Sequence, residues 1–569
     1  MRRKIRLTRI LLIACLSSVL VLSLWGYGLL HWDLTDWGRN DSTVAFQHYP
    51  TAAGLASYVQ GLALEYPDLV QVETIGHSLS GQPLLGVTIA APGSASPDTR
   101  PALFIAAQQH AREAITSQTV AYFVQDMLSR FQSDQAVGYL LSTRTIYWVP
   151  QLNPDGNDRF LSDNSRQRGN SRATDLDGDG QRSEDGPDAG GLGTLERQIF
   201  RFSDDWIKES QGKVFRSGWA AQDGNGDYLH IANHNLSIVT QTGRIIEQQD
   251  DDKDGRTNED GLLGVDLNRN WDADWDRGDA APSSQLYRGA DPFSEPETAA
   301  VRDYVLSHPN IVAGLDVHSG TELILIPWSK IDAETPDHEI LDQLARKGSQ
   351  LTDTAHTVAS QGLYMAYGTF KDWLYQQGIL ALAPEIYGSR QFTRIVRLWP
   401  TNWYLTFGSL AEQFNPRPAA IGQSGERWKG FLLYMLAALP EANLSSLSLD
   451  GQELSLDCTN TGLVPLDLDV ELWRDGRKIA SRRLLDLSDE TATLTFASVT
   501  DGSYLLRFRS RPVIAVKQHA SFSGELPLTV ASGHLRPLLD AAAPPDLGQS
   551  WSGLTAPADP YETDKWHIR

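Results

Sequence analysis

The chain has 569 residues, which is too long for one compact core, so its length predicts two or more domains. Its composition, 41% apolar and 21% charged, is that of a globular protein and excludes a chain that is disordered throughout. The formal net charge of −22 argues against a nucleic-acid partner, which would require a basic face.

The N-terminus has a basic flank followed by an uncharged apolar run. We expect residues 1–9 to form a cytoplasmic tail, 10–30 a transmembrane anchor and 31–45 a polar linker, because the run is long enough to span a bilayer as a helix. The catalytic part would then be periplasmic or extracellular. A cleaved signal peptide, giving a secreted protein, and a lipoprotein signal at Cys15 remain as alternatives. Cys458 is the only other cysteine, so no disulfide is expected within the outer domains.

Residues 46–440 read as an α/β domain. A helical pattern (TAAGLASYVQGLALEYP) precedes two alternating strands that are broken by Ser-Gly, the signature of a hairpin. Four short apolar runs then alternate with helical stretches: PALFIAAQQ, RTIYWVPQLNP, IVAGLDVHSG and GILALAPEIYG. This alternation predicts a mixed, mostly buried central sheet flanked by helices.

The character of the sequence changes after residue 440. Residues 441–537 alternate apolar and polar positions between turn signals such as Asp-Gly, which predicts a small all-β sandwich domain. We expect it to support the packing or folding of the main domain rather than to bind carbohydrate. Residues 538–569 are rich in Ala, Pro and Asp and are predicted to be a disordered tail.

An Asp-rich insertion, residues 171–262, contains a short internal repeat. The segments DLDGDGQRSEDG (175–186) and DDDKDGRTNEDG (250–261) share the pattern D-x-D-x-D-G-x-x-x-E-D-G. Carboxylates that alternate around a glycine turn predict a structural calcium site, although the last acidic pair falls at loop positions 10 and 11 instead of 12. A solvated acidic loop is the alternative. The candidate ligands are Asp175, Asp177, Asp179, Asp250, Asp252 and Asp254.

Polar side chains follow the apolar runs of the α/β domain, where such folds gather their functional groups. His110 and Glu113 have H-x-x-E spacing, and His318 follows a later run. Two imidazoles and a carboxylate that leave one position open would suit a zinc hydrolase. Because H-x-x-E pairs are common by chance, a polar strand end is the alternative.

Several motifs follow in a fixed order, and together they carry a resemblance. After the entry segment IGHSLSGQPLLGVTI come QLNPDG, GVDLNRNW, SEPET, DVHSG, YMAYGTFKDW and APEIYG. Over roughly residues 45–435 the chain resembles the carboxypeptidase A-like family of zinc metallocarboxypeptidases.

The resemblance implies the catalytic residues. His110, Glu113 and His318 match the zinc ligands, and Asp266 matches the carboxylate that supports the first ligand histidine. Glu385 matches the general base, which would take the proton of a zinc-activated water.

The resemblance also implies the substrate contacts. Asn268 and Arg269 match the clamp for a terminal carboxylate, and Arg112 matches an auxiliary arginine in the outer cleft. Arg168 matches the arginine that stabilises the oxyanion, with Arg166 as a rival.

Two further positions concern closure of the site over the substrate and the preference for the terminal side chain. Tyr364 matches the mobile tyrosine that closes over the substrate, and Tyr367 is its alternative. Lys371 matches the position that lines the pocket for the terminal side chain, so we expect a preference for acidic C-terminal residues or a glutamyl-type linkage. A lysine that points to solvent is the competing interpretation.

The sequence therefore predicts a membrane-anchored zinc metallocarboxypeptidase that hydrolyses the C-terminal peptide bond. An endopeptidase for cell-wall stem peptides of the glutamyl–diaminopimelate type would use the same chemistry. An inactive peptide-binding pseudo-enzyme is the alternative of another class, and it is disfavoured because the ligands and Glu385 are all present. The Asp-rich insertion is expected near the cleft rim, where it would restrict long substrates.

Overall fold

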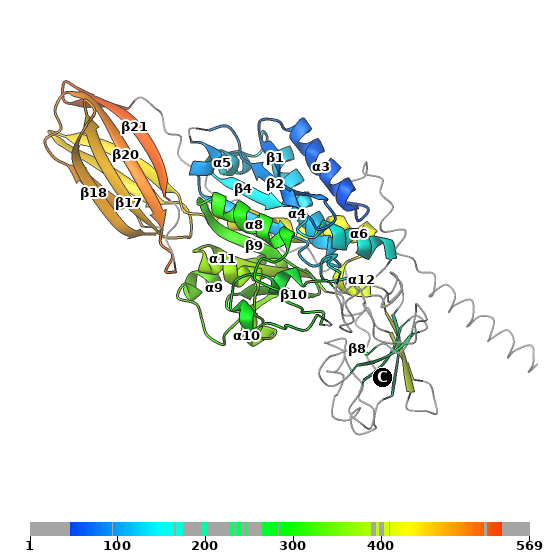
Figure 1. The fold of residues 1–569 in the computed structure, drawn as a ribbon. Coiled ribbons are helices and arrows are strands. Elements are labelled where there is room, and N and C mark those ends of the chain that lie inside the picture. Colours follow the sequence, from blue (N-terminus) through cyan, green and yellow to red (C-terminus); the bar gives the residue numbers. More distant parts are fainter. Residues whose placement is uncertain are drawn as a thin grey trace, which may run out of the picture.

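The computed structural model describes most of the chain between residues 46 and 537. The described ranges are 46–93, 95–163, 167–173, 264–282, 284–388, 410–488, 490–516 and 521–537. Six further strands are described by their backbone alone, at 196–201, 228–232, 235–239, 245–246, 394–397 and 403–408. Two folded parts follow one another along the chain, an α/β part and an all-β part (Figure 1).

The α/β part is built on an eight-stranded sheet in the order β1-β2-β4-β3-β9-β12-β10-β11. Its four central strands, β4, β3, β9 and β12, are parallel, whereas β1, β2 and β10 join by antiparallel pairing and β11 pairs parallel with β10. The strands are β1 (Val70–His77), β2 (Pro83–Ile89), β3 (Ala102–Ala107), β4 (Thr145–Val149), β9 (Ile311–Val317), β10 (Thr321–Ile326), β11 (Ala355–Val358) and β12 (Leu380–Tyr387). The predicted α/β fold with a mixed central sheet is confirmed.

Helices cover both faces of this sheet. One core contains apolar side chains of α3 (Ala52–Glu65), α4 (Ala114–Arg130), α5 (Gln135–Thr143), α9 (His338–Thr352) and α13 (Ile421–Ala437). The other contains those of α8 (Pro296–Ser307) and α11 (Phe370–Gln376). Strand β3 supplies Leu103 and Ile105 to the first core and Phe104 to the second, because successive side chains of a strand point to opposite faces. Both faces of β3 are therefore shielded from solvent, which explains why the sequence of this strand is apolar throughout.

Three further helices and several 3₁₀ turns are described in the α/β part. They are α6 (Pro154–Asp163), α10 (Ala359–Gly362) and α12 (Leu410–Phe414), with 3₁₀ turns at Pro97–Thr99, Leu267–Arg269, Trp275–Arg277 and Pro418–Ala420.

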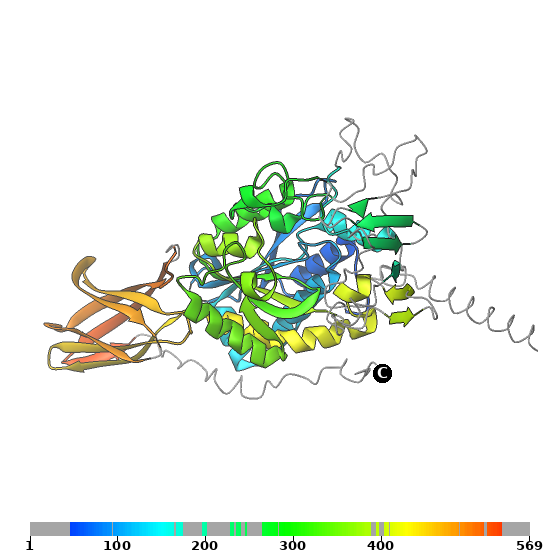
Figure 2. The ribbon, with the colours of Figure 1, turned by 90° about the horizontal axis from the view of Figure 1, so that it is seen from below.

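The C-terminal part is a two-sheet β-sandwich that lies at one end of the molecule (Figure 2). One sheet has the order β15-β16-β19 and the other β18-β17-β20-β21-β22. The strands are β15 (Ala442–Asp450), β16 (Glu453–Asn460), β17 (Leu466–Arg474), β18 (Arg477–Leu487), β19 (Ala492–Phe496), β20 (Gly502–Pro512), β21 (Phe522–Ala531) and β22 (His534–Pro537). Every second residue of β17 from Leu466 to Leu472 faces the sandwich core, as the alternation in the sequence predicts.

The sandwich packs on the α/β part. Ile514 and Phe522 are buried in the first core of the α/β part, and the backbone N–H of Ala515 donates to the carboxylate of Asp337 at 2.9 Å. These contacts join the sandwich to the α/β part, and a role in its packing or folding stays a prediction.

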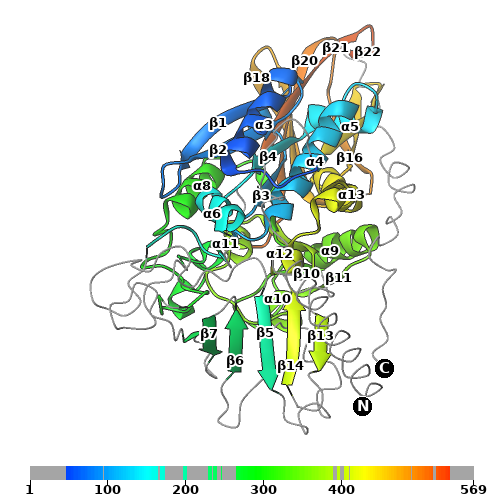
Figure 3. The same ribbon diagram turned by 90° about the vertical axis from the view of Figure 1, so that its right-hand side faces the viewer.

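Short strands of the Asp-rich insertion lie beside a segment that follows β12. Strand β5 (Glu196–Arg201) pairs with β14 (Trp403–Gly408), which also pairs with β13 (Arg394–Arg397). Strands β6 (Tyr228–Ala232), β7 (Asn235–Val239) and β8 (Ile245–Ile246) form a second small sheet next to β5 (Figure 3). The insertion is thus tied by strand pairing to the chain between Glu385 and α12.

The predicted membrane anchor, residues 10–30, lies outside the described residues. Among the helices that are described, none is both long and apolar enough to cross a bilayer.

Candidate active site

The strand ends of the sheet bring three distant motifs together. His110 follows β3, His318 follows β9, and Glu385 lies near the end of β12. Because β3, β9 and β12 are adjacent and parallel, their carboxyl ends meet at one edge of the sheet. His318 and Glu385 are paired as a parallel bridge, so their side chains leave the same face of the sheet.

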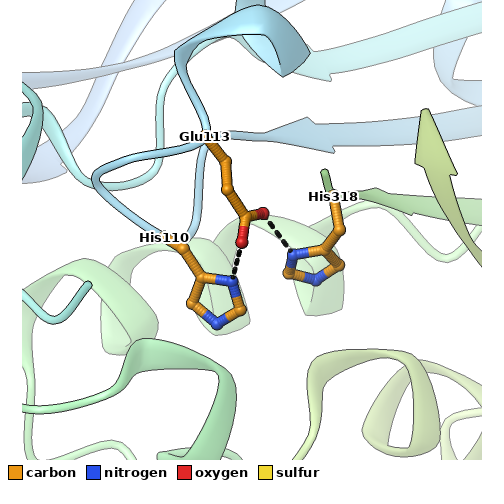
Figure 4. A group of neighbouring side chains, drawn as sticks. All are labelled: His110, Glu113 and His318. Atoms are coloured by element: carbon orange, nitrogen blue, oxygen red, sulfur yellow. Dashed lines mark hydrogen bonds and ion pairs between the residues drawn. The ribbon is translucent and has the colours of Figure 1, made fainter. Parts of the chain in front are cut away.

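Glu113 lies between the two histidines and contacts both (Figure 4). Its Oε1 is 2.7 Å from Nδ1 of His110, and its Oε2 is 3.0 Å from Nδ1 of His318. The two rings are 4.7 Å apart, and all three side chains are buried. Burial alone would raise the pKa of Glu113, but the imidazoles of His110 and His318 hold it well below its usual range. The carboxylate is therefore anionic and fixed between two Nδ1 atoms.

Asp266 supports this cluster from the side of His110. Its Oδ1 lies 3.2 Å from Nε2 of His110, and its Oδ2 accepts a hydrogen bond from Nε of Arg168 at 2.9 Å. The same Oδ1 caps the turn Leu267–Arg269 by accepting from the N–H of Asn268. Although burial opposes ionisation, Arg168 keeps the pKa of Asp266 well below its ordinary value.

Glu385 is a carboxyl group held in a low-dielectric position. Its Oε2 is buried and has no hydrogen-bond partner among the residues that the structure describes. Burial raises its pKa to about 8; Glu113 adds to this rise, whereas His318 and Arg168 oppose it. A nearby cation would favour the anionic form, which is the form that can accept a proton.

Asn268 and Arg269 lie next to the cluster. Asn268 Nδ2 is 2.9 Å from Nε2 of His318, and its Oδ1 accepts from the N–H of Phe370. Arg269 donates through Nη2 to the hydroxyl of Tyr364 at 3.1 Å, and Tyr364 is 47% exposed. Tyr364 thus stands at the surface directly over the guanidinium.

The alternative tyrosine, Tyr367, is in a different place. Its hydroxyl accepts from Arg277, and the Arg277 guanidinium lies 4.4 Å from the centre of its ring. Tyr364, and not Tyr367, is therefore the tyrosine that contacts Arg269.

Arg112 and Lys371 are both buried. The guanidinium of Arg112 packs 4.3 Å from the centre of the Phe414 ring. Lys371 is 2% exposed, so it does not point to solvent; its Nζ donates to the carboxylate of Asp372 at 2.8 Å and to the hydroxyl of Ser329 at 3.1 Å.

Some predicted residues lie outside the described residues. These are Arg166, the rival of Arg168, and the six aspartates of the acidic repeat. A calcium site in the insertion therefore stays a prediction.

Comparison with known proteins assigns the chain to a family. The family model described as zinc carboxypeptidase matches residues 55–212 and 238–417, more than half of the chain. The chain belongs to the zinc carboxypeptidase family. The resemblance carried by the motifs is thereby confirmed.

Individual relatives are distant. Carboxypeptidase A1 of Mus musculus is 26% identical over 348 residues, which are 59% of this chain and 62% of that protein. Carboxypeptidase B of Astacus astacus is 25% identical over 57% of this chain and 80% of its own length. The crystal structure of carboxypeptidase A from Helicoverpa armigera is 17% identical with a TM-score of 0.47, covering 69% of this chain and 75% of that one. The chain thus spans about three fifths of the length of the curated carboxypeptidase A1 that it matches.

The cluster of His110, Glu113 and His318 fits a zinc ion. One nitrogen each of His110 and His318 and one oxygen of Glu113 lie within 4.8 Å of one another. Ligand atoms about 2.0–2.2 Å from a tetrahedral Zn²⁺ are roughly 3.4 Å apart, so a small adjustment places all three on one ion. The partnerless Oε2 of Glu385 beside them is a second sign that a group belongs in this space.

The structure also reveals site residues that motif matching missed. Asp316 Oδ2 lies 2.9 Å from Nε2 of His318, and Phe414 holds Arg112. Asp316 had a signal in the sequence, because a residue two positions before His318 in a strand shares its face. Phe414 lies far along the chain from Arg112, and no local pattern links the two.

Proposed function

We propose that this chain is a metallocarboxypeptidase that removes the C-terminal residue of peptides. The observation that carries the proposal is the contact between the ligand cluster and the carboxylate clamp, in which Asn268 lies 2.9 Å from His318. A peptide held at its terminal carboxylate by Asn268 and Arg269 would therefore present its last peptide bond to the cluster and to Glu385.

Each residue has a task that follows from its chemistry. Arg269 would hold the terminal carboxylate with its planar guanidinium, and Tyr364 would close over the bound residue. Glu385 would take the proton of the attacking water and pass it to the leaving amine. Arg168 is tethered to Asp266 by Nε, and its terminal amino groups would donate to the oxygen that becomes negative. Zinc bound by His110, Glu113 and His318 would supply Lewis acidity and lower the pKa of a bound water.

Two peptides of one sequence, one ending in a free carboxylate and one in an amide, test this proposal. Hydrolysis followed by mass spectrometry should show loss of the last residue from the free acid only. In the variant Arg269→Gln, kcat/KM for the free acid should fall at least tenfold, because charge-assisted hydrogen bonds are lost. Equal cleavage of both peptides would contradict the proposal. Cleavage of purified muropeptides but of neither peptide would replace it with the cell-wall endopeptidase.

We extend the proposal to the terminal side chain, for which Lys371 supports an acidic preference. An ammonium group has three donor protons, and two of them bind Asp372 and Ser329. Among the described residues the third proton has no partner, and a substrate carboxylate would satisfy it. Peptides that differ only in a last residue of Glu, Phe or Lys measure this preference.

We also propose that residues 10–30 tether the enzyme to a membrane. Their uncharged run and the basic flank before it support this. The full chain should stay in the membrane pellet after alkaline carbonate extraction, whereas a chain that begins at residue 31 should not. If both chains are released from the membrane pellet, the tether is refuted, and the peptidase proposal is unaffected.

A further inference from the structure

Asp316 places a second buried carboxylate against the metal-binding cluster, on the side of His318. It lies two residues before His318 at the end of β9, and both side chains are buried. Its Oδ2 is 2.9 Å from Nε2 of His318. On the other ligand histidine the corresponding atom, Nε2 of His110, is 3.2 Å from Asp266. Each imidazole thus has a carboxylate on the nitrogen opposite to Glu113.

A chain of buried side chains holds Asp316 in place. Its Oδ1 accepts from Nε2 of Gln109 at 3.4 Å, and Oε1 of Gln109 accepts from Nε1 of Trp271 at 2.8 Å. Gln109 and Trp271 are almost completely buried. The chain therefore connects the residue before His110, the end of the GVDLNRNW motif and the strand that carries His318.

The other oxygen of Asp316, Oδ2, requires a hydrogen-bond donor. Oδ2 is buried, and within the described part of the chain no hydrogen bond with good geometry satisfies it. Leaving such an atom without a donor is costly, and Nε2 of His318 is the polar group beside it. A proton on Nε2 would satisfy the carboxylate.

Asn268 competes with Asp316 for Nε2 of His318, so it affects which nitrogen of the ring carries the proton. Its Nδ2, which can only donate, also lies 2.9 Å from Nε2 of His318, while its Oδ1 is used by the N–H of Phe370. If Asn268 donates to Nε2, a neutral imidazole must carry its proton on Nδ1, which is the nitrogen that faces Glu113. A protonated Nδ1 has no lone pair for a metal. Asp316 and Asn268 therefore favour opposite tautomers of His318.

We propose that Asp316 is a positioning residue of the zinc site, which keeps the proton on Nε2 of His318 and so leaves Nδ1 free for the ion. Carboxylates that orient metal-bound histidines typically change metal affinity by about 10–100-fold. The zinc-binding part of this inference is independent of the proposed peptidase activity. A chain that binds zinc but cleaves no peptide would refute the activity alone.

The experiment measures zinc affinity by competition with a chromophoric chelator. The variant Asp316→Ala should bind zinc about 10–100-fold more weakly than the parent. Asp316→Asn, which conserves volume and one acceptor oxygen, should lie between the two. Asp155→Ala is the matched control, because Asp155 is also buried in the same domain but binds Ser78 and the N–H of Ser80 instead of a candidate ligand. Its zinc affinity should equal that of the parent.

A double variant separates a tautomer effect from a merely structural one. In Asp316→Ala/Asn268→Leu the competing donor is removed, so zinc affinity should recover at least threefold over Asp316→Ala. Far-ultraviolet circular dichroism at each step verifies that the variants are folded. If Asp316→Ala does not fold, zinc affinity is compared between Asp316→Asn and Asp316→Asn/Asn268→Leu instead. Zinc affinity within twofold of the parent in both single Asp316 variants, or no recovery in the double variant, would overturn the proposal.

Discussion

Asp266 and Arg168 form a buried ion pair in which Nε lies 2.9 Å from Oδ2. The other oxygen of Asp266 faces His110, so a single carboxylate joins a candidate metal ligand to the arginine proposed to stabilise the oxyanion. The ion pair holds the guanidinium of Arg168 through Nε. We therefore expect the positions of His110 and Arg168 to be coupled.

Replacing Asp266 should damage stability and zinc binding together. In Asp266→Ala the buried Arg168 charge loses its partner, and breaking such a pair costs about 3–5 kcal/mol of unfolding free energy. Zinc affinity should fall about 10–100-fold because His110 loses its support. Urea unfolding and chelator competition measure the two effects. Asp303→Ala, which removes an exposed partner of Arg302, should cost less than about 1 kcal/mol and leave zinc affinity unchanged. Equal effects of the two substitutions would refute the coupling.

Glu385→Gln should abolish turnover while the metal stays bound. The amide cannot accept a proton from water, and general-base catalysis contributes about 10²–10⁴-fold to the rate. The side chain is not among the three grouped ligands, so zinc content should match that of the parent. Steady-state kinetics with one good peptide and metal analysis of the same sample test this. Activity within tenfold of the parent would remove Glu385 from the mechanism, and a parent that is itself inactive with zinc bound would indicate a pseudo-enzyme.

Lys371→Met should erase the proposed preference for an acidic terminal residue. Methionine keeps most of the length and fills the buried space, whereas Lys371→Asp would place a second carboxylate beside Asp372 with no cation. The ratio of kcat/KM for peptides ending in Glu and in Phe should fall about tenfold or more, the worth of a charge-assisted hydrogen bond. Lys330→Met is the control, since the Lys330 ammonium binds Asp274. An unchanged ratio in Lys371→Met would show that Lys371 is only structural.

Glu297 should make the stability of the fold depend on pH. It is fully buried, and burial raises its pKa from 4.5 to about 7, with Glu295 adding to the rise. The folded state therefore keeps a proton that the unfolded state releases. This contribution is complete below about pH 4.5 and is lost as the pH rises to about 7. Glu297→Gln should stabilise the protein by roughly 1–3 kcal/mol at pH 8 and not at pH 4.5, by urea unfolding. The same gain at both pH values would contradict the assignment.

Local patterns in the sequence predict where the polar side chains of the candidate site lie, and the motif order adds their implied roles. The H-x-x-E spacing lets the side chain of Glu113 reach back to His110 across three residues. The apolar runs before His110 and His318 mark buried parallel strands, and parallel strands bring their ends to one edge. Periodicity and the general rules of α/β folds predict these strand ends, but the choice of His110, Glu113 and His318 as zinc ligands is implied by the family resemblance that the ordered motifs carry.

The surroundings of the site could not be predicted because they depend on contacts between distant segments. The ammonium of Lys371 is buried against Ser329, 42 residues earlier, and an isolated lysine in a sequence is usually exposed. The ion pair between Arg168 and Asp266 spans the whole Asp-rich insertion. Alternation predicted the strands of the sandwich, but the order in which β17 joins β18 and β20 depends on tertiary packing.

The central claim is that His110, Glu113 and His318 hold one zinc ion that peptide trimming requires. The most direct measurement combines metal analysis of the purified full chain with mass spectrometry of a mixed peptide library, before chelation, after chelation and after zinc is restored. We predict one zinc per chain, removal of single C-terminal residues, loss of this activity with chelator and its return with zinc. A chain that trims peptides equally well after all zinc has been removed would contradict the claim.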